Sequence, residues 1–422
     1  MPGLFTIKDT LANKIALFHL LLLMGSLPFD MFYSHLILIS LIIHTAIQFK
    51  KTDFFNVRKK PAVLHILSSV FLITVYSTAY AADRASAYNE WGRQILILLF
   101  PLVFYLLRID LKKYRNFLLM GFSLVCTATV CFLYLYAVFT IRFYGLPLLS
   151  LFSHAFANHN FSAPVDIHAT FFSMQLGLSL IFLLSLFLQE QRMRYRLLLL
   201  FCMLVLSAGL IQLSSKSVCC CMFLLINLGL PWFLNGKIAI RQYVLVTATV
   251  SLIAVGLIFS LGTLSTLRER FVGQLRNDLS QAPAVEFGDS RLSRWNIVAG
   301  LIARSPVTGY GAGSEIPLLR DSFFEHQLYR SFLSRLNAHN QYLSFLLKSG
   351  VIGLLIYLAT LLFGFRKAIA GRDLLFFAFV SLIAFVSLSE NLLDVNKGII
   401  FYAFFFSFFI FSAEDKPQII SG

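Results

Sequence analysis

The stretch that decides the fold runs from residue 197 to residue 234 and reads LLLLFCMLVLSAGLIQLSSKSVCCCMFLLINLGLPWFL. A transmembrane helix needs about 20 apolar residues, so this run is too long for a single span. Its one charged residue, Lys216, follows two serines. The polar break predicts two transmembrane helices, over residues 194–213 and 215–234.

The composition of the whole chain also indicates a membrane protein. Of its 422 residues, 58% are hydrophobic and 13% are charged, whereas soluble domains carry about 25% charged residues. A net charge of +15 would suggest a nucleic-acid partner in a soluble protein. Here the basic residues fall in short clusters between apolar runs, which indicates topology control and contact with anionic lipid headgroups, not nucleic acid.

The six cysteines all lie in apolar segments. They show neither zinc-ligand spacing with histidine nor a disulfide framework. We interpret them as small apolar helix residues, and the sequence predicts no metal site.

Twelve apolar stretches are candidate spans, so the predicted fold class is an all-α polytopic membrane protein. Helices one to nine would occupy residues 1–262, a long and partly helical loop residues 263–339, and helices ten to twelve with a short tail residues 340–422. The predicted spans are 12–28, 31–49, 62–82, 91–107, 115–140, 165–188, 194–213, 215–234, 242–262, 340–365, 372–390 and 396–412.

The lysines and arginines of the short connections predict the orientation. With the N-terminus in the cytoplasm, the inner connections and tails receive 20 of these residues and the short outer connections receive 5. Because cytoplasmic loops are enriched in lysine and arginine, we expect both termini to be cytoplasmic. The loop 263–339 is then on the outer, periplasmic face.

That loop contains nine arginines and no lysine. Long translocated loops escape the charge bias, and arginine suits bidentate binding of phosphate. The arginines therefore suggest an anion site, and a solvated loop lying on lipid headgroups is the alternative. Within the loop, the pattern of 289–304 predicts a helix capped by Asp289 or Ser290, followed by a helix stop at 305–306 and a flexible turn at 309–313.

His339 is the strongest candidate for chemistry, because it stands where the loop re-enters the membrane. Imidazole readily accepts and donates a proton near neutral pH. A structural histidine is the alternative interpretation, but two motifs favour function. The first is His339-Asn340, nine residues, Gly350, two residues, Gly353. The second joins Arg291-x-x-x-Trp295 to 305–313, SPVTGYGAG.

In this order, around such a loop, the two motifs resemble those of the O-antigen ligase and Wzy-type polymerase superfamily. The resemblance implies a metal-independent glycosyltransferase, without a cofactor, in the bacterial inner membrane. Its donor would be a glycan on undecaprenyl diphosphate. Its acceptor would be a hydroxyl of lipid A–core or of another lipid-linked repeat unit. His339 would act on the acceptor, and Arg291 would bind the diphosphate.

Further residues are candidates for the same site, each with an alternative. Arg294 could share the phosphate or pair with Asp289. Lys216 stands where relatives often carry an arginine; it could bind phosphate as a point charge or be an interfacial lysine that snorkels. Trp295 would pack the loop helix onto the membrane domain in preference to stacking on a sugar.

The remaining candidates are weaker. Asn340 accompanies His339 in the motif and would contact substrate. Arg93 could add a third cation. His168 could bind sugar or acceptor, although a structural hydrogen bond is favoured. Glu390 and Asp394 could bind hydroxyls, although helix capping is favoured.

A transporter or flippase is the alternative function, because many helices and intramembrane cations also suit a carrier. The sequence shows no matched pair of interrupted helices and no similarity between its two halves. A carrier also has little use for so long an outer loop. The transferase interpretation is therefore preferred.

Overall fold

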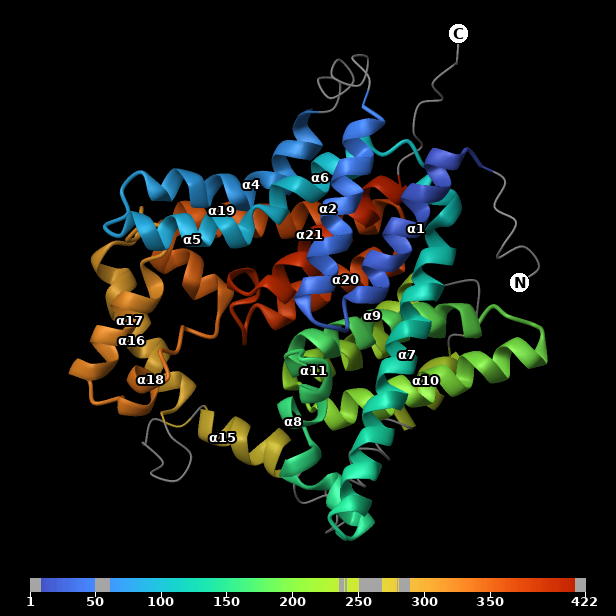
Figure 1. The fold of residues 1–422 in the computed structure, drawn as a ribbon. Coiled ribbons are helices and arrows are strands. Elements are labelled where there is room, and N and C mark those ends of the chain that lie inside the picture. The colour runs from blue at the N-terminus through green and yellow to red at the C-terminus, as the bar shows by residue number, and fades with distance from the viewer. Residues whose placement is uncertain are drawn as a thin grey trace.

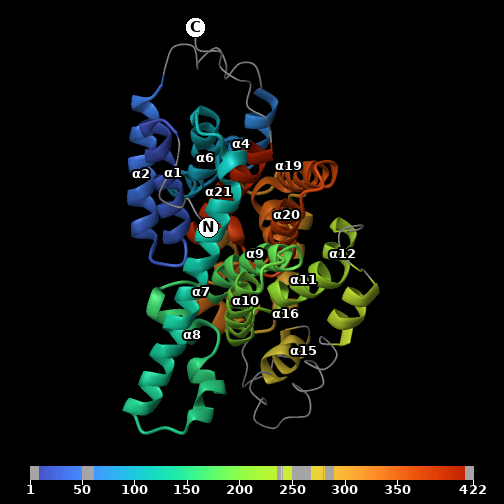
Figure 2. The same cartoon turned by 90° about the vertical axis from the view of Figure 1, so that its right-hand side faces the viewer.

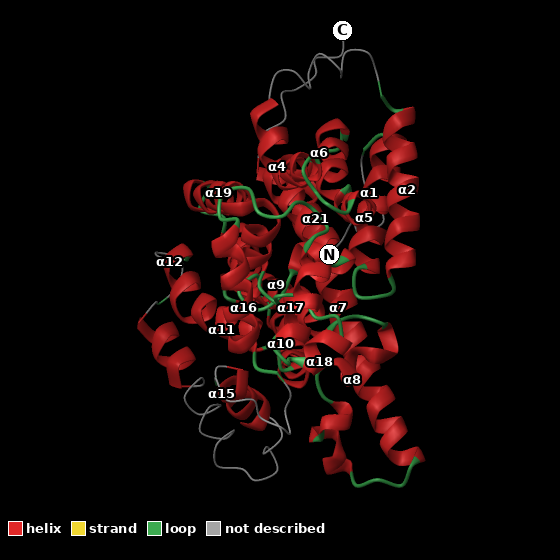
Figure 3. Ribbon diagram, turned by 90° about the vertical axis from the view of Figure 1, so that its left-hand side faces the viewer, coloured by secondary structure: helices red, strands yellow, loops and turns green. Residues whose placement is uncertain are grey.

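The computed structural model describes residues 9–49, 61–234, 239, 241–249, 268–278, 280 and 289–413. Within these ranges the chain is helical and contains no strand (Figure 3). This confirms the all-α class that the apolar runs predicted. Both termini lie outside the described residues, so the predicted orientation stays a prediction.

The α-helices have the following bounds: α1 (Leu11–Ser26), α2 (Met31–Ile47), α4 (Pro61–Thr78), α5 (Arg84–Gln94), α6 (Leu96–Leu106), α7 (Leu111–Phe143), α8 (His159–Ser162), α9 (Ala169–Phe187), α10 (Met193–Leu213), α11 (Lys216–Leu224), α12 (Leu230–Phe233), α15 (Gln274–Asp278), α16 (Arg291–Arg304), α17 (Glu315–Glu325), α18 (Tyr329–Leu333), α19 (Gln341–Ala370), α20 (Leu374–Val386) and α21 (Asn396–Ala413). Short 3-10 or π-helical turns are η1 (Leu148–Phe152), η2 (His154–Phe156), η3 (Ala163–Val165), η4 (Leu225–Gly229), η6 (Glu269–Gly273) and η7 (Leu392–Asp394).

Six described helical segments are long and apolar enough to cross a membrane, and four further apolar helices are shorter. The predicted break at 214–216 is confirmed, because α10 ends at Leu213 and α11 begins at Lys216. The predicted span 91–107 is instead split between α5 and α6, which meet at Ile95. The predicted span 242–262 lies largely outside the described residues. The count of twelve spans therefore stays a prediction.

Helix α7 is the longest, with 33 residues. At 1.5 Å per residue it is about 50 Å long, well beyond a hydrocarbon core of about 30 Å. Figures 1 and 2 show its C-terminal half running past the other helices. The short turns η1 and η2 follow the end of α7, and the chain then returns through α8 and η3 to α9.

The core is centred on α21. All of its residues from Lys397 to Ser412 are buried, and its phenylalanines contact those of α6, α7 and α20, for example Phe404 with Phe100 and Phe405 with Phe122. Aromatic rings bury large areas and prefer such tilted and edge-on contacts. The η7 segment packs against α21 and carries Asp394, which contacts the buried Lys348.

The long loop forms a helical cap on the N-terminal end of α19. Helices α16, α17 and α18 gather there in Figure 1, around a small core that includes Val298, Leu319, Phe323 and Leu347. The predicted helix over 289–304 is confirmed as α16, with Ser290 as its N-cap. Trp295 donates from Nε1 to the carbonyl of Ala338 at 2.8 Å, which ties α16 to the end of the loop, and its packing onto the membrane domain stays a prediction.

The glycine-rich turn at 309–313 is held firmly, in contrast to the flexible turn predicted. Helix α19 is interrupted at Gly350, whose φ of 62° is unfavourable for other residues. The free carbonyls of Leu347 and Lys348 accept hydrogen bonds from the amides of Tyr310 and Gly311, at 2.9 and 2.8 Å. The two motifs of the sequence therefore meet at one backbone contact, which anchors the loop to the membrane helix.

Candidate active site

His339 and Glu390 form the centre of the candidate site. His339 lies between the loop and α19, with a φ of 47°, and its Nδ1 is 3.3 Å from Oε2 of Glu390. Its own amide donates to Oδ1 of Asn337 at 3.0 Å. Glu390 follows α20 in the chain, so the pair joins the outer ends of two helices.

The protonation of the pair follows from the charge of Glu390. Burial alone would raise the pKa of this carboxyl, but the hydrogen bond from His339 and the electrostatic influence of His339, His168 and Arg291 lower it. An ionised carboxylate can only accept, so Nδ1 of His339 carries the proton and donates it. In the neutral imidazole, Nε2 is then the acceptor. The His339 side chain is 27% exposed, so a substrate can reach it.

Two cations lie beside this pair and share an acidic partner. Arg291, the first residue of α16, donates from Nη1 to the carbonyl of Ser389 at 3.0 Å. Its Nε is 3.7 Å from Oδ2 of Asp278, and Nζ of Lys216 is 3.4 Å from the same oxygen. The structure therefore brings the predicted residues Arg291 and Lys216 together. Asp278, which joins them, was missed from the sequence.

Arg294 lies one turn after Arg291 on α16 and is buried. Its Nε and Nη1 have no hydrogen-bond partner within the described residues. Burial, together with the charge of Arg291, lowers its pKa to about 10, so it remains charged at neutral pH. The pairing with Asp289 that the sequence left open is not a hydrogen bond here, because Asp289 instead accepts from the amide of Ser331 at 2.7 Å. Two unused donors on a buried cation are unusual in a folded protein.

His168 reaches the site from the start of α9. Its Nδ1 accepts from the amide of Thr170 at 3.3 Å, so the structural hydrogen bond favoured from the sequence is present. Burial lowers the pKa of His168 to about 4. His159 and His339 also lower it, whereas Glu390 raises it. The ring is therefore neutral and presents Nε2–H. His159 packs against it with ring centres 4.1 Å apart.

Asn340 and Arg93 were also predicted to contact substrate, and these contacts stay predictions. The side chain of Asn340 caps α19, accepting from the amides of Tyr342 and Leu343 at 3.0 and 3.1 Å. Arg93 is an exposed residue near the end of α5. Burial raises the pKa of Asp394, whereas Lys348 is the strongest of the influences that lower it. The charge of Arg93 adds a smaller effect that also lowers this pKa. Within the described residues Arg93 makes no hydrogen bond or ion pair with His339 or Arg291, so the third cation of the site stays a prediction.

Residues 169–358 match the family model described as O-antigen ligase. The resemblance to the O-antigen ligase and polymerase superfamily is thereby confirmed. The family implies a membrane glycosyltransferase of the ligase or polymerase type, acting on a lipid-linked glycan and a lipid acceptor, and the chain is a bacterial membrane protein. A search of curated proteins finds no match.

The segment that matches the family model, residues 169–358, contains Lys216, Asp278, Arg291 and His339 but not Glu390.

The favoured capping role of Glu390 and Asp394 was wrong. Glu390 contacts His339, and Oδ1 of Asp394 accepts from Nζ of the buried Lys348 at 2.7 Å.

A buried polar network fixes the backbone on both sides of His339. Oε1 of Glu315 accepts from the amide of Ala338 at 2.9 Å and from Nδ2 of Asn391 at 2.8 Å. Oδ1 of Asn391 accepts from the amide of Asn340 at 2.8 Å. Ala338 and Asn340 flank His339 in the chain, and Asn391 follows Glu390, so the network holds the residues around both members of the pair.

The network extends into the bundle through charged groups. Nζ of Lys348 also lies 2.7 Å from Oε1 of Glu90, and Oε2 of Glu90 accepts from the amide of Gly313 at 2.6 Å. Charges placed within apolar spans are costly and generally paired. Lys348 lies within the predicted span 340–365, so that rule could have marked it as a paired charge from the sequence; Glu90 lies outside the predicted spans.

Six other arginines of the loop are exposed, and Arg320 pairs with the neighbouring Asp321; these are Arg268, Arg276, Arg304, Arg320, Arg330 and Arg335. The anion interpretation is best supported at Arg291 and Arg294, which lie close to the His339–Glu390 pair. The part of the chain that the structure describes has no group of three or more His, Cys, Asp or Glu side chains that could hold a metal. The six cysteines are free thiols.

Proposed function

We propose that the chain transfers a glycan from a lipid diphosphate to an acceptor hydroxyl at the His339–Arg291 cluster. The observation that carries the proposal is the hydrogen bond from Nη1 of Arg291 to the carbonyl of Ser389. Ser389 directly precedes Glu390, the partner of His339. An anion-binding side chain and a proton-accepting side chain are thereby held next to one another, as glycosyl transfer from a diphosphate requires.

His339 acts as the base. Its Nε2 accepts the proton of the acceptor hydroxyl while that oxygen forms a bond to the anomeric carbon of the donor sugar. The bond from the anomeric carbon to the diphosphate oxygen breaks, and the lipid diphosphate leaves with the bonding electrons. Glu390 stabilises the imidazolium that results.

The cations stabilise the leaving group. Arg291 offers a planar fork, Lys216 a mobile point charge, and Arg294 two unused donors on the same helix. Charge that develops on the departing diphosphate is best stabilised by groups already held in place. Asp278 neutralises Arg291 and Lys216 when no diphosphate is bound and gives way to the phosphate oxygens.

Undecaprenyl diphosphate is the proposed carrier, and lipid A–core or a second repeat unit is the proposed acceptor. The chain would reside in the inner membrane with both termini in the cytoplasm and the site facing the periplasm. His168, neutral and half-buried beside the pair, would donate a hydrogen bond to sugar or acceptor. These specifics rest on the family resemblance and the charge distribution of the short connections.

Reconstitution tests the proposal. Purified protein in nanodiscs is supplied with an undecaprenyl-diphosphate glycan and with lipid A–core. Glycan on lipid A–core indicates a ligase, and a lengthened glycan on the carrier indicates a polymerase. Movement of the donor across liposome membranes without any new glycosidic bond would contradict the proposal and favour the flippase alternative.

A further inference from the structure

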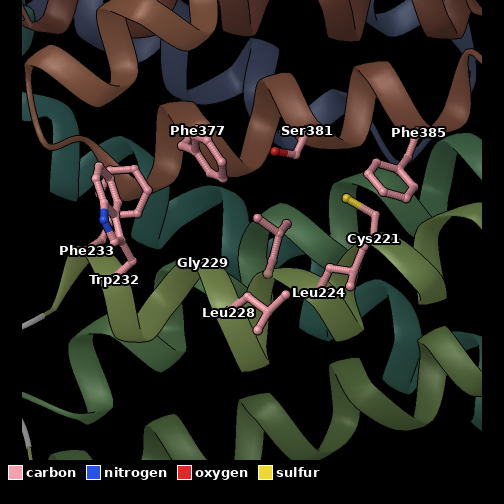
Figure 4. A pocket seen from close by; sticks show the side chains of 10 residues that line it. Cys221, Leu224, Leu228, Gly229, Trp232, Phe233, Phe377, Ser381 and Phe385 are labelled. Atoms are coloured by element: carbon pink, nitrogen blue, oxygen red, sulfur yellow. The ribbon is translucent and has the colours of Figure 1, made fainter. Parts of the chain in front are cut away.

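An apolar groove runs along the bundle between α11, η4 and α12 on one side and α20 on the other. Figure 4 shows its two walls, with Cys221 facing Phe385 at one end and Phe233 facing Phe377 at the other. Its volume is about 360 Å³, and it is partly open to its surroundings. Ser381 is the one hydroxyl-bearing residue of the lining.

The groove follows one face of a continuous helical segment. Its lining residues on α11, η4 and α12 recur at helical spacing, from Cys221 through Leu225 and Leu228 to Trp232. Gly229 lies among them with a φ of −66°, an ordinary helical value, so its lack of a side chain widens the groove without relieving backbone strain. The groove is a built feature of the helix surface, not a gap left by a broken helix.

Both walls end at the candidate active site. Lys216 begins α11, five residues before Cys221, or about 7.5 Å above it along the helix. On the opposite wall, Phe385 lies four residues before Ser389, whose carbonyl accepts from Arg291. The cations therefore stand at one end of the groove, and its other walls are apolar.

This arrangement matches an amphiphile with one anionic end and a long hydrocarbon chain. We propose that the groove binds the polyprenyl tail of the lipid-linked donor, directly below the site of its diphosphate. The proposal rests on the proposed function, and it assigns the tail to these helices and to no other face. A diphosphate at Lys216 and Arg291 would leave its first isoprene units at Cys221 and Phe385, and the chain would continue past Gly229.

Filling the lower half of the groove tests this placement. Gly229→Leu adds a side chain where a Cβ would meet only Leu225 and Phe377, at 3.4 and 3.8 Å. Initial rates are measured with two donors that carry the same glycan on undecaprenyl or on geranyl diphosphate. We expect KM for the undecaprenyl donor to rise about tenfold, because part of the chain loses its apolar contacts. KM for the geranyl donor, which ends above Gly229, should change less than about twofold.

Two further variants guard against misfolding. Ser381→Phe fills the groove from the α20 wall and should reproduce the effect. Phe223→Trp adds bulk on α11 at an exposed position outside the lining and should leave both KM values unchanged. Unchanged KM for the undecaprenyl donor in both groove variants would overturn the proposal while leaving the proposed function intact.

A binding measurement separates the two ideas if no transfer is observed. Undecaprenyl diphosphate with a diazirine in its tail is photolysed on the wild-type protein in nanodiscs of phosphatidylglycerol. Labelling of residues 221–233 and 377–385, removed by excess undecaprenyl diphosphate, supports the tail site independently of activity. Labelling elsewhere, or labelling that the excess does not remove, overturns it and indicates an ordinary membrane lipid in the groove.

Discussion

Nδ1 of His339 lies 3.3 Å from Oε2 of Glu390, although the two residues are 51 positions apart in the chain. The contact sets the tautomer of the imidazole and leaves Nε2 to accept a proton. We therefore expect Glu390→Gln to lower kcat by about 10²-fold or more, the range in which an oriented base contributes, with a small change in KM. Rates over a range of acceptor concentrations, with melting curves of both proteins, provide the check. Wild-type kcat in a well-folded Gln variant would show that the contact has no catalytic role.

The same carboxylate gives a pH dependence with a defined sign. Burial raises the pKa of Glu390, but His339, His168 and Arg291 together lower it more, so the pKa is lowered in the folded protein. Its ionised form therefore contributes stability that is present above its unfolded pKa of about 4.3 and is lost as pH falls through the lower folded value. Thermal melts between neutral and acidic pH should show wild-type stability falling more than that of Glu390→Gln. Parallel curves for the two proteins would contradict this assignment.

Arg291 and Lys216 should respond differently to exchange of their side chains. Arg291→Lys removes a planar fork that contacts Ser389 and Asp278, so it should lose most transfer activity, about 10- to 100-fold. Lys216→Arg supplies a second fork and should keep activity. Arg304→Lys, at the exposed end of the same helix, is the matched control and should be neutral. Equal losses in Arg291→Lys and Arg304→Lys would remove the special role of Arg291.

Asp278 neutralises two cations that the proposed function assigns to a diphosphate. Asp278→Asn should therefore bind undecaprenyl diphosphate several-fold more tightly, a modest gain because the pairs are partly exposed. Isothermal calorimetry in nanodiscs measures Kd directly. Weaker binding in the variant would mean that Asp278 supports the site by holding Arg291 and Lys216 in place.

Glu315 should position the backbone around His339 as a buried hydrogen-bond acceptor. Burial, assisted by the charge of Asp394, raises its pKa. Glu315→Gln preserves an acceptor for Ala338 and Asn391 and should retain activity, whereas Glu315→Ala should destabilise the protein by about 1–3 kcal/mol through unsatisfied partners and lower kcat.

The raised pKa of Glu315 also fixes the sign of its pH effect. Its contribution to stability is present below its unfolded pKa and is lost as pH rises through the folded value. The wild-type melting temperature should therefore fall more steeply with rising pH than that of Glu315→Gln. Inactive Glu315→Gln with a normal melting temperature would show that the charge of Glu315 is needed.

The sequence predicted the parts of this site that depend on motif and local pattern. The break before Lys216, the cap of α16 at Ser290 and the position of His339 at the start of α19 all follow from spacing and composition. The predicted residues that do meet, His339, Arg291 and Lys216, are brought together by contacts between distant segments. No local pattern encodes those contacts.

Partners, not motif members, escaped prediction from the sequence: Asp278 was missed, and Glu390 was named without its role as the partner of His339. Asp278 and Glu390 acquire their roles only because they lie beside cations and an imidazole from other elements. Glu390 follows the apolar helix α20, and a polar residue at a helix end is typical of a cap, so capping was predicted for it. The fixed turn at 309–313 was equally hidden, because its rigidity comes from the carbonyls that Gly350 frees in α19.

The most direct test of the account is single-turnover glycan transfer by His339→Ala in nanodiscs, with undecaprenyl-diphosphate glycan bound before the acceptor is added. We expect normal donor binding and membrane insertion with no transfer above background, because Nε2 of His339 is the proposed acceptor of the hydroxyl proton. Transfer at the wild-type rate by this variant would contradict the role of His339 and, with it, the proposed site.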